Sequence, residues 1–139
     1  MIKKKLLYIL PSVLVLAVAT YIIFFNNSDN EVSTLNKINK SRLIGNWIRT
    51  DSNYELRILE LSSSGTIQAQ YFNPRAINVG KANWEESYGN LKIKVELQDV
   101  NYPGSTYTLN YLPDRDMLAG EYYQAVEGLT FYVEFSRVN

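Results

Sequence analysis

Few residue types that could perform catalysis occur in this chain. Its 139 residues include no histidine and no cysteine, which removes the commonest general base, the thiolate nucleophile and most zinc sites. Glu85 and Glu86 are neighbours, so in an extended segment they point to opposite faces and cannot share a proton. Asp114 and Asp116 are spaced as in a calcium loop, but Arg115 separates them and no Gly-x-Glu completion follows. We therefore expect no catalytic residue, no metal site, no cofactor and no enzymatic activity.

Tyrosine is the more informative residue type, because a phenol inside a protein needs a hydrogen-bond partner. Four of the 11 tyrosines fall in or near the apolar phase of predicted strands: Tyr71, Tyr107, Tyr111 and Tyr122. Tyr102 comes just before one of these strands. Together with any amides that face inward among Gln68, Gln70, Asn110 and Gln124, these phenols predict a small-molecule pocket. The alternative is that the rings simply fill a narrow barrel.

Arg75 is a further candidate ligand-binding residue. It follows Asn73-Pro74, where the proline forces the preceding residue toward an extended conformation and withholds one amide. From this loop the guanidinium can bind a carboxylate or a phosphate with two hydrogen bonds, or pair with an acidic residue of a neighbouring loop.

The elements that must position these residues are strands. From residue 43 onward apolar and polar residues alternate with period two, and turn signals recur about every twelve residues, which is typical of an all-β barrel or sandwich. Eight strands are expected, at residues 43–50, 54–61, 66–72, 77–84, 91–98, 106–112, 117–124 and 129–136. Short connectors favour an eight-stranded antiparallel up-and-down β-barrel, because closure removes exposed edges. An open, rolled sheet or a sandwich is the alternative.

Two kinds of local irregularity are also predicted. The apolar phase shifts after Ile58 and again around Gly80, which indicates a β-bulge at each place. The run Tyr102-Pro103-Gly104-Ser105 fits a type II turn, since proline fixes φ at the second position and glycine accepts a positive φ at the third.

Gly45-Asn46-Trp47 opens the first strand and Arg137 follows the last. With this pair of features the two ends of the barrel resemble those of the calycin superfamily, which includes lipocalins, fatty-acid-binding proteins and avidins. The resemblance implies a lipocalin-like barrel in which Trp47 lies across the closed end and Arg137 packs over the indole. The segments "YFNPRAINVGKANW", "VELQDVNYPGSTYTLNY", "DMLAGEYYQA" and "FYVEFSR" also resemble small exported bacterial proteins to which no activity is attached.

The N-terminal region reads as a targeting segment. Three lysines at residues 3–5 precede a largely apolar run at 6–25, which is long enough for a transmembrane helix. We favour an uncleaved signal anchor (1–25), because a signal peptide cut after Ala19 would leave an apolar N-terminus. A polar linker (26–41) and the barrel domain (42–139) follow. The lysines place the N-terminus in the cytoplasm and the barrel on the extracytoplasmic side; if the segment is cleaved, the barrel is secreted or periplasmic.

The charge balance narrows the possible partners. Without the three N-terminal lysines, 11 basic and 14 acidic residues remain, a net charge of −3, so nucleic acid is not an expected partner. The sequence thus predicts a membrane-tethered barrel that binds a small molecule at its open end. The alternative is a structural or protein-interaction module of the cell envelope with a filled core.

Overall fold

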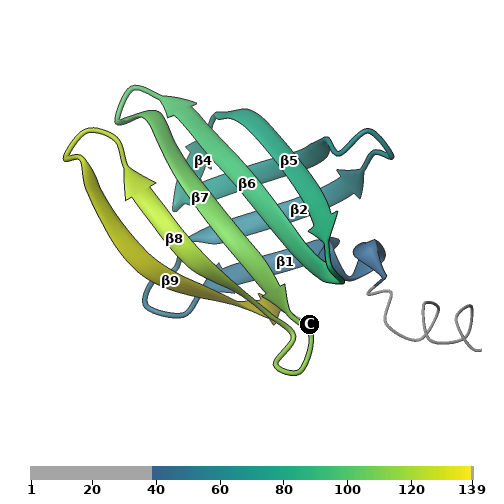
Figure 1. Ribbon diagram of the computed structural model, residues 1–139. Coiled ribbons are helices and arrows are strands. Elements are labelled where there is room, and N and C mark those ends of the chain that lie inside the picture. Colours follow the sequence, from purple (N-terminus) through teal and green to yellow (C-terminus); the bar gives the residue numbers. More distant parts are fainter. Residues whose placement is uncertain (1–38, 139) are drawn as a thin grey trace, which may run out of the picture. The chain divides into compact units, whose positions relative to one another are not determined.

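The structure, a computed structural model, describes residues 39–138. The predicted membrane anchor and nearly all of the predicted linker lie outside this range. A short 3-10 helix, η1 (Lys40–Leu43), precedes nine strands (Figure 1). The strands are β1 (Gly45–Arg49), β2 (Glu55–Leu61), β3 (Ile67–Asn73), β4 (Arg75–Ile77), β5 (Val79–Ser87), β6 (Asn90–Asp99), β7 (Tyr102–Leu112), β8 (Met117–Gln124) and β9 (Leu129–Val138). In the described residues no helix has the length and apolar character needed to cross a membrane.

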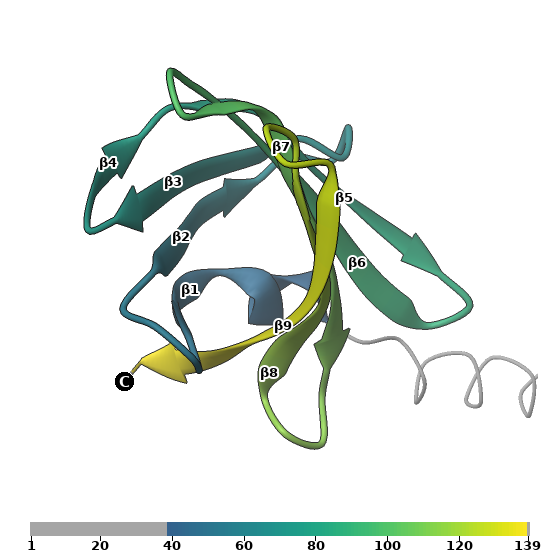
Figure 2. The same ribbon diagram turned by 90° about the vertical axis from the view of Figure 1, so that its left-hand side faces the viewer.

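All nine strands form one antiparallel sheet in the order β4-β3-β2-β1-β9-β8-β7-β6-β5. The first and last strands are paired, so the sheet curls into a barrel whose two free edges face each other (Figure 2). A single bridge between Thr66 and Asn83 and a hydrogen bond of 2.8 Å from the Trp84 amide to the Gly65 carbonyl connect those edges. The predicted all-β, up-and-down barrel is confirmed as a nearly closed barrel.

The number of strands is nine, not the predicted eight. The strand expected at 77–84 is divided at Asn78: β4 before it pairs with β3, and β5 after it pairs with β6. At Asn78 the chain leaves β3 and begins to pair with β6. The Asn78 backbone amide donates to the Asp99 carboxylate at 3.0 Å, and its backbone carbonyl accepts from the Gln98 amide at 2.8 Å. Each contact joins two residues that are about twenty positions apart in the sequence. The alternation of apolar and polar residues therefore gives no sign of either contact.

Three β-bulges interrupt the strand pairing. One follows Ile58 in β2 and another lies between Val79 and Lys81 in β5, and both of these predictions are confirmed. The third, between Pro103 and Thr106 in β7, was not predicted. Bulges increase local twist and bend a strand, which helps a sheet of short strands to close.

The predicted type II turn at residues 102–105 is wrong. Asp99 pairs directly with Tyr102, so the chain reverses at residues 100–101, and Pro103 and Gly104 already belong to β7. The Asp99 carboxylate starts this earlier turn by accepting from the Val100 amide at 2.7 Å. Gly104, with φ of 86°, supplies the positive φ of the bulge instead of a turn.

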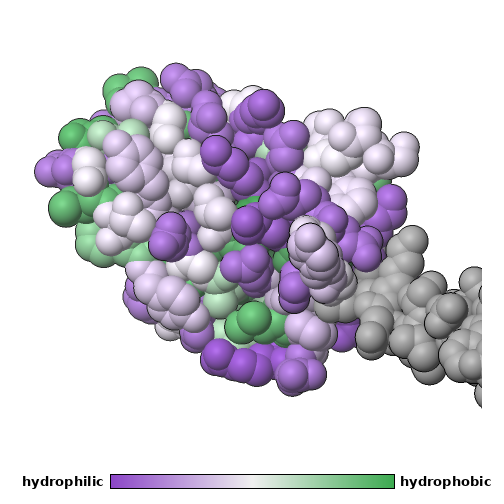
Figure 3. Space-filling model, viewed as in Figure 1, coloured by the Kyte–Doolittle hydropathy of each residue, from purple (hydrophilic) through white to green (hydrophobic). Residues whose placement is uncertain are grey.

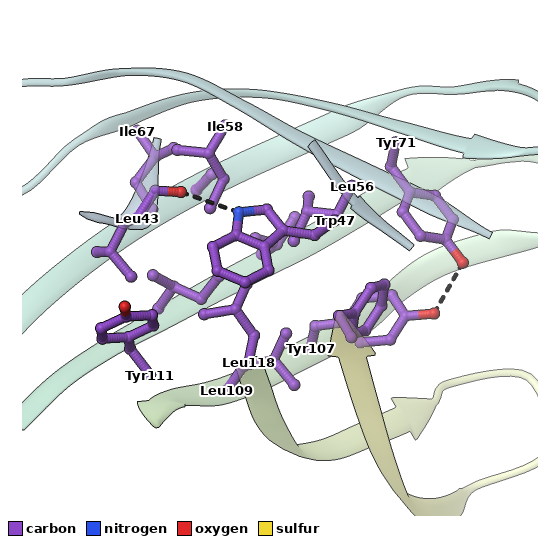
Figure 4. Close-up of a cluster of buried hydrophobic side chains, with 14 of the residues drawn as sticks. Leu43, Trp47, Leu56, Ile58, Ile67, Tyr71, Tyr107, Leu109, Tyr111 and Leu118 are labelled. Carbon is purple, nitrogen blue, oxygen red and sulfur yellow. Dashed lines mark hydrogen bonds between the residues drawn. The ribbon is translucent and has the colours of Figure 1, made fainter. Parts of the chain in front are cut away.

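Large side chains fill the barrel interior (Figure 4). Every second residue of β6, from Leu91 to Leu97, is fully buried, as the alternation predicts. The largest fully buried side chains are aromatic: Trp47, Tyr71, Tyr107 and Phe135. Leu43 of η1 is fully buried in the same core as Trp47, so this core extends to the end of the barrel that η1 covers.

Trp47 and Arg137 close that end. The Trp47 indole nitrogen donates to the Leu43 carbonyl of η1 at 2.9 Å, and the Arg137 guanidinium lies 4.1 Å from the centre of the Trp47 ring. Gly45 has φ of 147°, and a Cβ at this position would collide with the Arg137 guanidinium. Glycine is therefore needed at Gly45 both for its backbone conformation and for space.

Asp116 holds this closure together from the β7–β8 turn. Its carboxylate accepts from Arg137 Nε at 2.7 Å and from the Tyr111 hydroxyl at 2.8 Å. Arg137 also donates to the carbonyl of Ile44 at 2.8 Å and to that of Arg42. The hydrogen bonds from Arg137 and Tyr111 lower the pKa of Asp116, so the carboxylate stays ionised at neutral pH.

Candidate functional site

The opposite end of the barrel is open and holds a cavity of about 340 Å³. Figure 2 looks into this end, with η1 visible across the far one. The lining comes from β1, β3, β7, β8, β9 and the β1–β2 turn. Five of the ten lining side chains are polar and five are aromatic: Arg49, Asp51, Ser52, Asn73 and Gln124, and Tyr54, Tyr71, Tyr102, Tyr122 and Phe131.

Three tyrosines from three strands form the floor of the cavity. The Tyr71 and Tyr107 hydroxyls share a hydrogen bond of 2.7 Å (Figure 4). The Tyr107 ring stacks on Tyr122 with centroids 4.5 Å apart. Burial raises the pKa of Tyr107 to about 12 and also raises those of Tyr71 and Tyr122. The phenols are therefore neutral hydrogen-bonding groups at physiological pH and not bases.

Arg49 brings a positive charge into the wall of the cavity, where its side chain is only 12% exposed. Its Nη2 donates to Asp51 Oδ2 at 2.9 Å. Nε lies 2.7 Å from Asp51 Oδ1, close enough for an ion pair, although its N–H is not aligned for a hydrogen bond. The guanidinium also lies 5.4 Å from the Tyr54 ring centre and 5.8 Å from that of Tyr122. Burial opposes the Arg49 charge, yet Asp51 keeps the pKa of Arg49 raised, and Arg49 in turn lowers the pKa of Asp51.

The rim carries the groups that are most accessible from outside. The Phe131 side chain is on the face of β9 that points into the barrel, but it is 43% exposed because it lies at the mouth. Asn73 donates to the Tyr102 hydroxyl through its side-chain nitrogen, which leaves its carbonyl oxygen to accept another hydrogen bond. The Gln124 side chain makes no hydrogen bond within residues 39–138.

The cavity brings together three of the predicted ligand-binding residues, Tyr71, Tyr102 and Tyr122. Tyr107 lies beneath them in the floor and is fully buried. Tyr111 lies at the closed end, edge-on to Trp47 at 6.2 Å, and is not part of the cavity. Arg75 is exposed on β4 and does not line the cavity. Of the four amides considered, Gln124 faces the cavity, while Gln68, Gln70 and Asn110 are exposed.

Two important lining residues, Arg49 and Phe131, are not among those selected as candidate ligand-binding residues from the sequence. Arg49 is two residues beyond Trp47 on the same strand, so period-two alternation already places its side chain inside the barrel. Phe131 belongs to the inward phase of β9, and its position at the mouth follows only from the strand register. The signal for Arg49 was thus present in the motif Gly-Asn-Trp-Ile-Arg.

A second hollow, of about 450 Å³, lies on the outer face of β5, β6 and β7. It is bordered mainly by outward-facing charged side chains, including Lys81, Lys94 and Glu96, and by the Lys92–Glu85 ion pair at 3.4 Å. Figure 3 shows hydrophilic side chains over this part of the sheet and hydrophobic ones at the β6–β7 and β8–β9 turns. The smaller cavity at the mouth is the better candidate, because aromatic and polar groups from six segments converge there.

Within residues 39–138 no three acidic side chains are grouped closely enough to hold a metal ion. Comparisons of the chain with protein-family models, with curated proteins and with solved structures found no match. The antiparallel, nearly closed barrel is compatible with a calycin-like fold.

Proposed function

We propose that this protein is a lipocalin-like barrel that binds a small molecule at its open end. The observation that supports this proposal is the cavity of about 340 Å³, in which aromatic walls surround an ion pair and several amide and hydroxyl groups. Its volume lies at the lower end of the range for ligand sites, and few convergent polar groups in an aromatic setting are typical of them. The filled interior below the tyrosine floor limits the ligand to the mouth.

Native mass spectrometry of the full chain, released from detergent in the gas phase, tests this proposal. We expect the spectrum to contain the mass of the protein with one bound ligand, which is either retained from the source cells or selected from a metabolite mixture. Gln124→Trp should abolish retention by filling the cavity. Tyr123→Trp is the matched control, because Tyr123 is the next residue on β8 and faces outward, 44% exposed. Equal retention by both variants, or no retained mass from any mixture, would refute binding at the mouth.

We also propose that residues 1–25 tether the barrel to a membrane, with the barrel on the extracytoplasmic side. The length of the apolar run and the preceding lysines support this. Intact mass of the protein purified from membranes distinguishes an uncleaved anchor from a signal peptide cut after Ala19. Protease digestion of intact cells and of permeabilised cells then reports the side on which the barrel lies.

A second candidate function is a protein-interaction module of the envelope. Tyr132 and Tyr123, 69% and 44% exposed, lie on the outer faces of the adjacent strands β9 and β8. Exposed tyrosine is enriched at protein interfaces. A photo-crosslinking residue at Tyr132 should give one defined adduct in native membranes, while the same group at Glu60, on the outer face of β2, should give none. Identical labelling at both positions would count against this function.

A further inference from the structure

We infer that the ligand held at the mouth is a neutral saccharide, either a free sugar or the end of a glycan. This inference rests on the proposed small-molecule function and specifies its ligand class. It follows from three properties of the cavity. Its two charged side chains are paired, the residues of 39–138 that line it include no aliphatic side chain, and Phe131 at its rim has no aromatic partner among these residues.

The paired charges disfavour ionic ligands. Asp51 already contacts the edge of Arg49 that carries Nε and Nη2, at 2.7 and 2.9 Å, so an anionic ligand would have to compete with this carboxylate or approach Nη1 beside it. A cationic ligand would meet the positive charge of Arg49, whose guanidinium lies over the Tyr54 and Tyr122 rings. Because Arg49 and Asp51 carry opposite charges, this ion pair adds no net charge to the cavity.

The composition of the walls disfavours a lipid. The ten lining residues include five aromatic and five polar side chains, and none is Leu, Ile, Val or Met. Apolar ligands are normally surrounded by aliphatic and aromatic side chains with only a few polar groups. Two amides, a carboxylate, a guanidinium and a hydroxyl, together with five aromatic rings of which four are phenols, suit a ligand that has many hydroxyl groups and also an apolar face. A sugar ring has both.

Phe131 provides the surface on which such a ring would lie. It is 43% exposed at the inner edge of the mouth, and within the described residues it has no aromatic or cationic partner. The C–H face of a pyranose packs against an aromatic ring, while its equatorial hydroxyls reach planar polar groups around it. The carbonyl oxygen of Asn73, the Gln124 amide and the exposed carboxylate of Asp51 supply such groups at this mouth.

The test is an NMR titration of the full-length chain with isotope-labelled Phe and Tyr. The chain is kept in a polyoxyethylene detergent, because the headgroups of sugar-based detergents would compete with the saccharide probes for the cavity. Glucose, galactose, N-acetylglucosamine and cellobiose are titrated as neutral probes. Glucuronate, choline, glycine and octanoate represent anionic, cationic, zwitterionic and lipid ligands. We expect at least one neutral saccharide to shift the ring signals of Phe131 and Tyr102, and Phe131→Ala to weaken its binding at least about tenfold.

Tyr132→Ala is the matched control, since Tyr132 is the next residue and faces outward, and it should change saccharide affinity less than about twofold. Shifts of the mouth signals by glucuronate, choline, glycine or octanoate but by no saccharide would overturn the saccharide inference and leave small-molecule binding standing. Equal losses of saccharide affinity in Phe131→Ala and Tyr132→Ala would overturn the saccharide inference as well. If no probe shifts the mouth signals and native mass spectrometry retains no ligand, the proposed function fails together with this inference.

Discussion

Replacement of Arg137 by alanine should cost far more stability than loss of an ordinary surface ion pair. The Arg137 side chain is 20% exposed and lies 4.1 Å from the Trp47 ring centre. A cation–π contact in a partly desolvated place contributes about 1–2 kcal/mol. The backbone carbonyls of Ile44 and Arg42 would also lose their charged donor, at about 1.5–3 kcal/mol for each such bond in isolation. Because these contributions share one side chain and are not additive, we expect Arg137→Ala to lower the free energy of unfolding by about 3–4 kcal/mol in total.

The assay is urea unfolding of the chain from residue 26 onward, followed by tryptophan fluorescence and far-ultraviolet circular dichroism. Arg115→Ala is the matched control: Arg115 also faces a carboxylate with two contacts, to Glu134 at 3.2 and 3.3 Å, but it is 54% exposed. Exposed pairs of this kind contribute about 0–1 kcal/mol. Arg137→Lys should recover part of the loss, because an ammonium can stay over the indole but cannot bridge Asp116 and two carbonyls.

A double-mutant cycle with Trp47→Phe separates the ring contact from the hydrogen bonds, and a coupling energy of about 1 kcal/mol is expected between Arg137 and Trp47. The reasoning is refuted if Arg137→Ala and Arg115→Ala lower the free energy of unfolding by the same amount. A coupling energy of zero would refute the cation–π contribution alone.

Three further predictions concern the same framework. As pH falls below about 4, the barrel should lose the stabilisation that comes from the lowered pKa of Asp116. In this pH range the urea midpoint of Asp116→Asn should vary less with pH than that of the unchanged protein. Above pH 10 stability should fall as pH rises, because the raised folded-state pKa values of Tyr71 and Tyr107 mean that these phenols ionise more readily in the unfolded chain; ultraviolet titration should show both ionising at higher pH than exposed tyrosines. Gly45→Ala should destabilise by about 1–3 kcal/mol in thermal unfolding, because its φ of 147° is strained for alanine, and a stable variant would contradict this.

The barrel was predictable because its signals are local. Alternation at residues 91–97 and short glycine-containing connectors are read directly from the sequence, and each corresponds to a strand or hairpin here. The division of the expected fourth strand was not readable, because it depends on the Asp99 carboxylate reaching Asn78 across the sheet. The same carboxylate moves the hairpin turn ahead of Pro103. The Asp99 side chain, which accepts from the distant Asn78 amide and from the adjacent Val100 amide, therefore accounts for both errors.

The site was predictable only in part, because strand phase gives the face of a residue but not its height in the barrel. Tyr107 and Tyr111 have the same phase on β7 and are about 13 Å apart along the strand. Tyr107 therefore lies in the floor of the open cavity, whereas Tyr111 reaches Asp116 at the closed end. Only the register of β7 against its neighbours assigns each ring to an end.

The height of the barrel also explains why the cavity lies at the mouth. On β1 the inward residues are Gly45, Trp47 and Arg49, which span about 13 Å at 3.3 Å per residue. Gly45 belongs to the closure and Arg49 to the cavity, so a single layer of large rings at the level of Trp47 separates the two ends. A barrel this short cannot enclose a ligand beneath a lid of loops. Any ligand that it holds must stay partly exposed at the mouth, which suits the end of a longer chain such as a glycan.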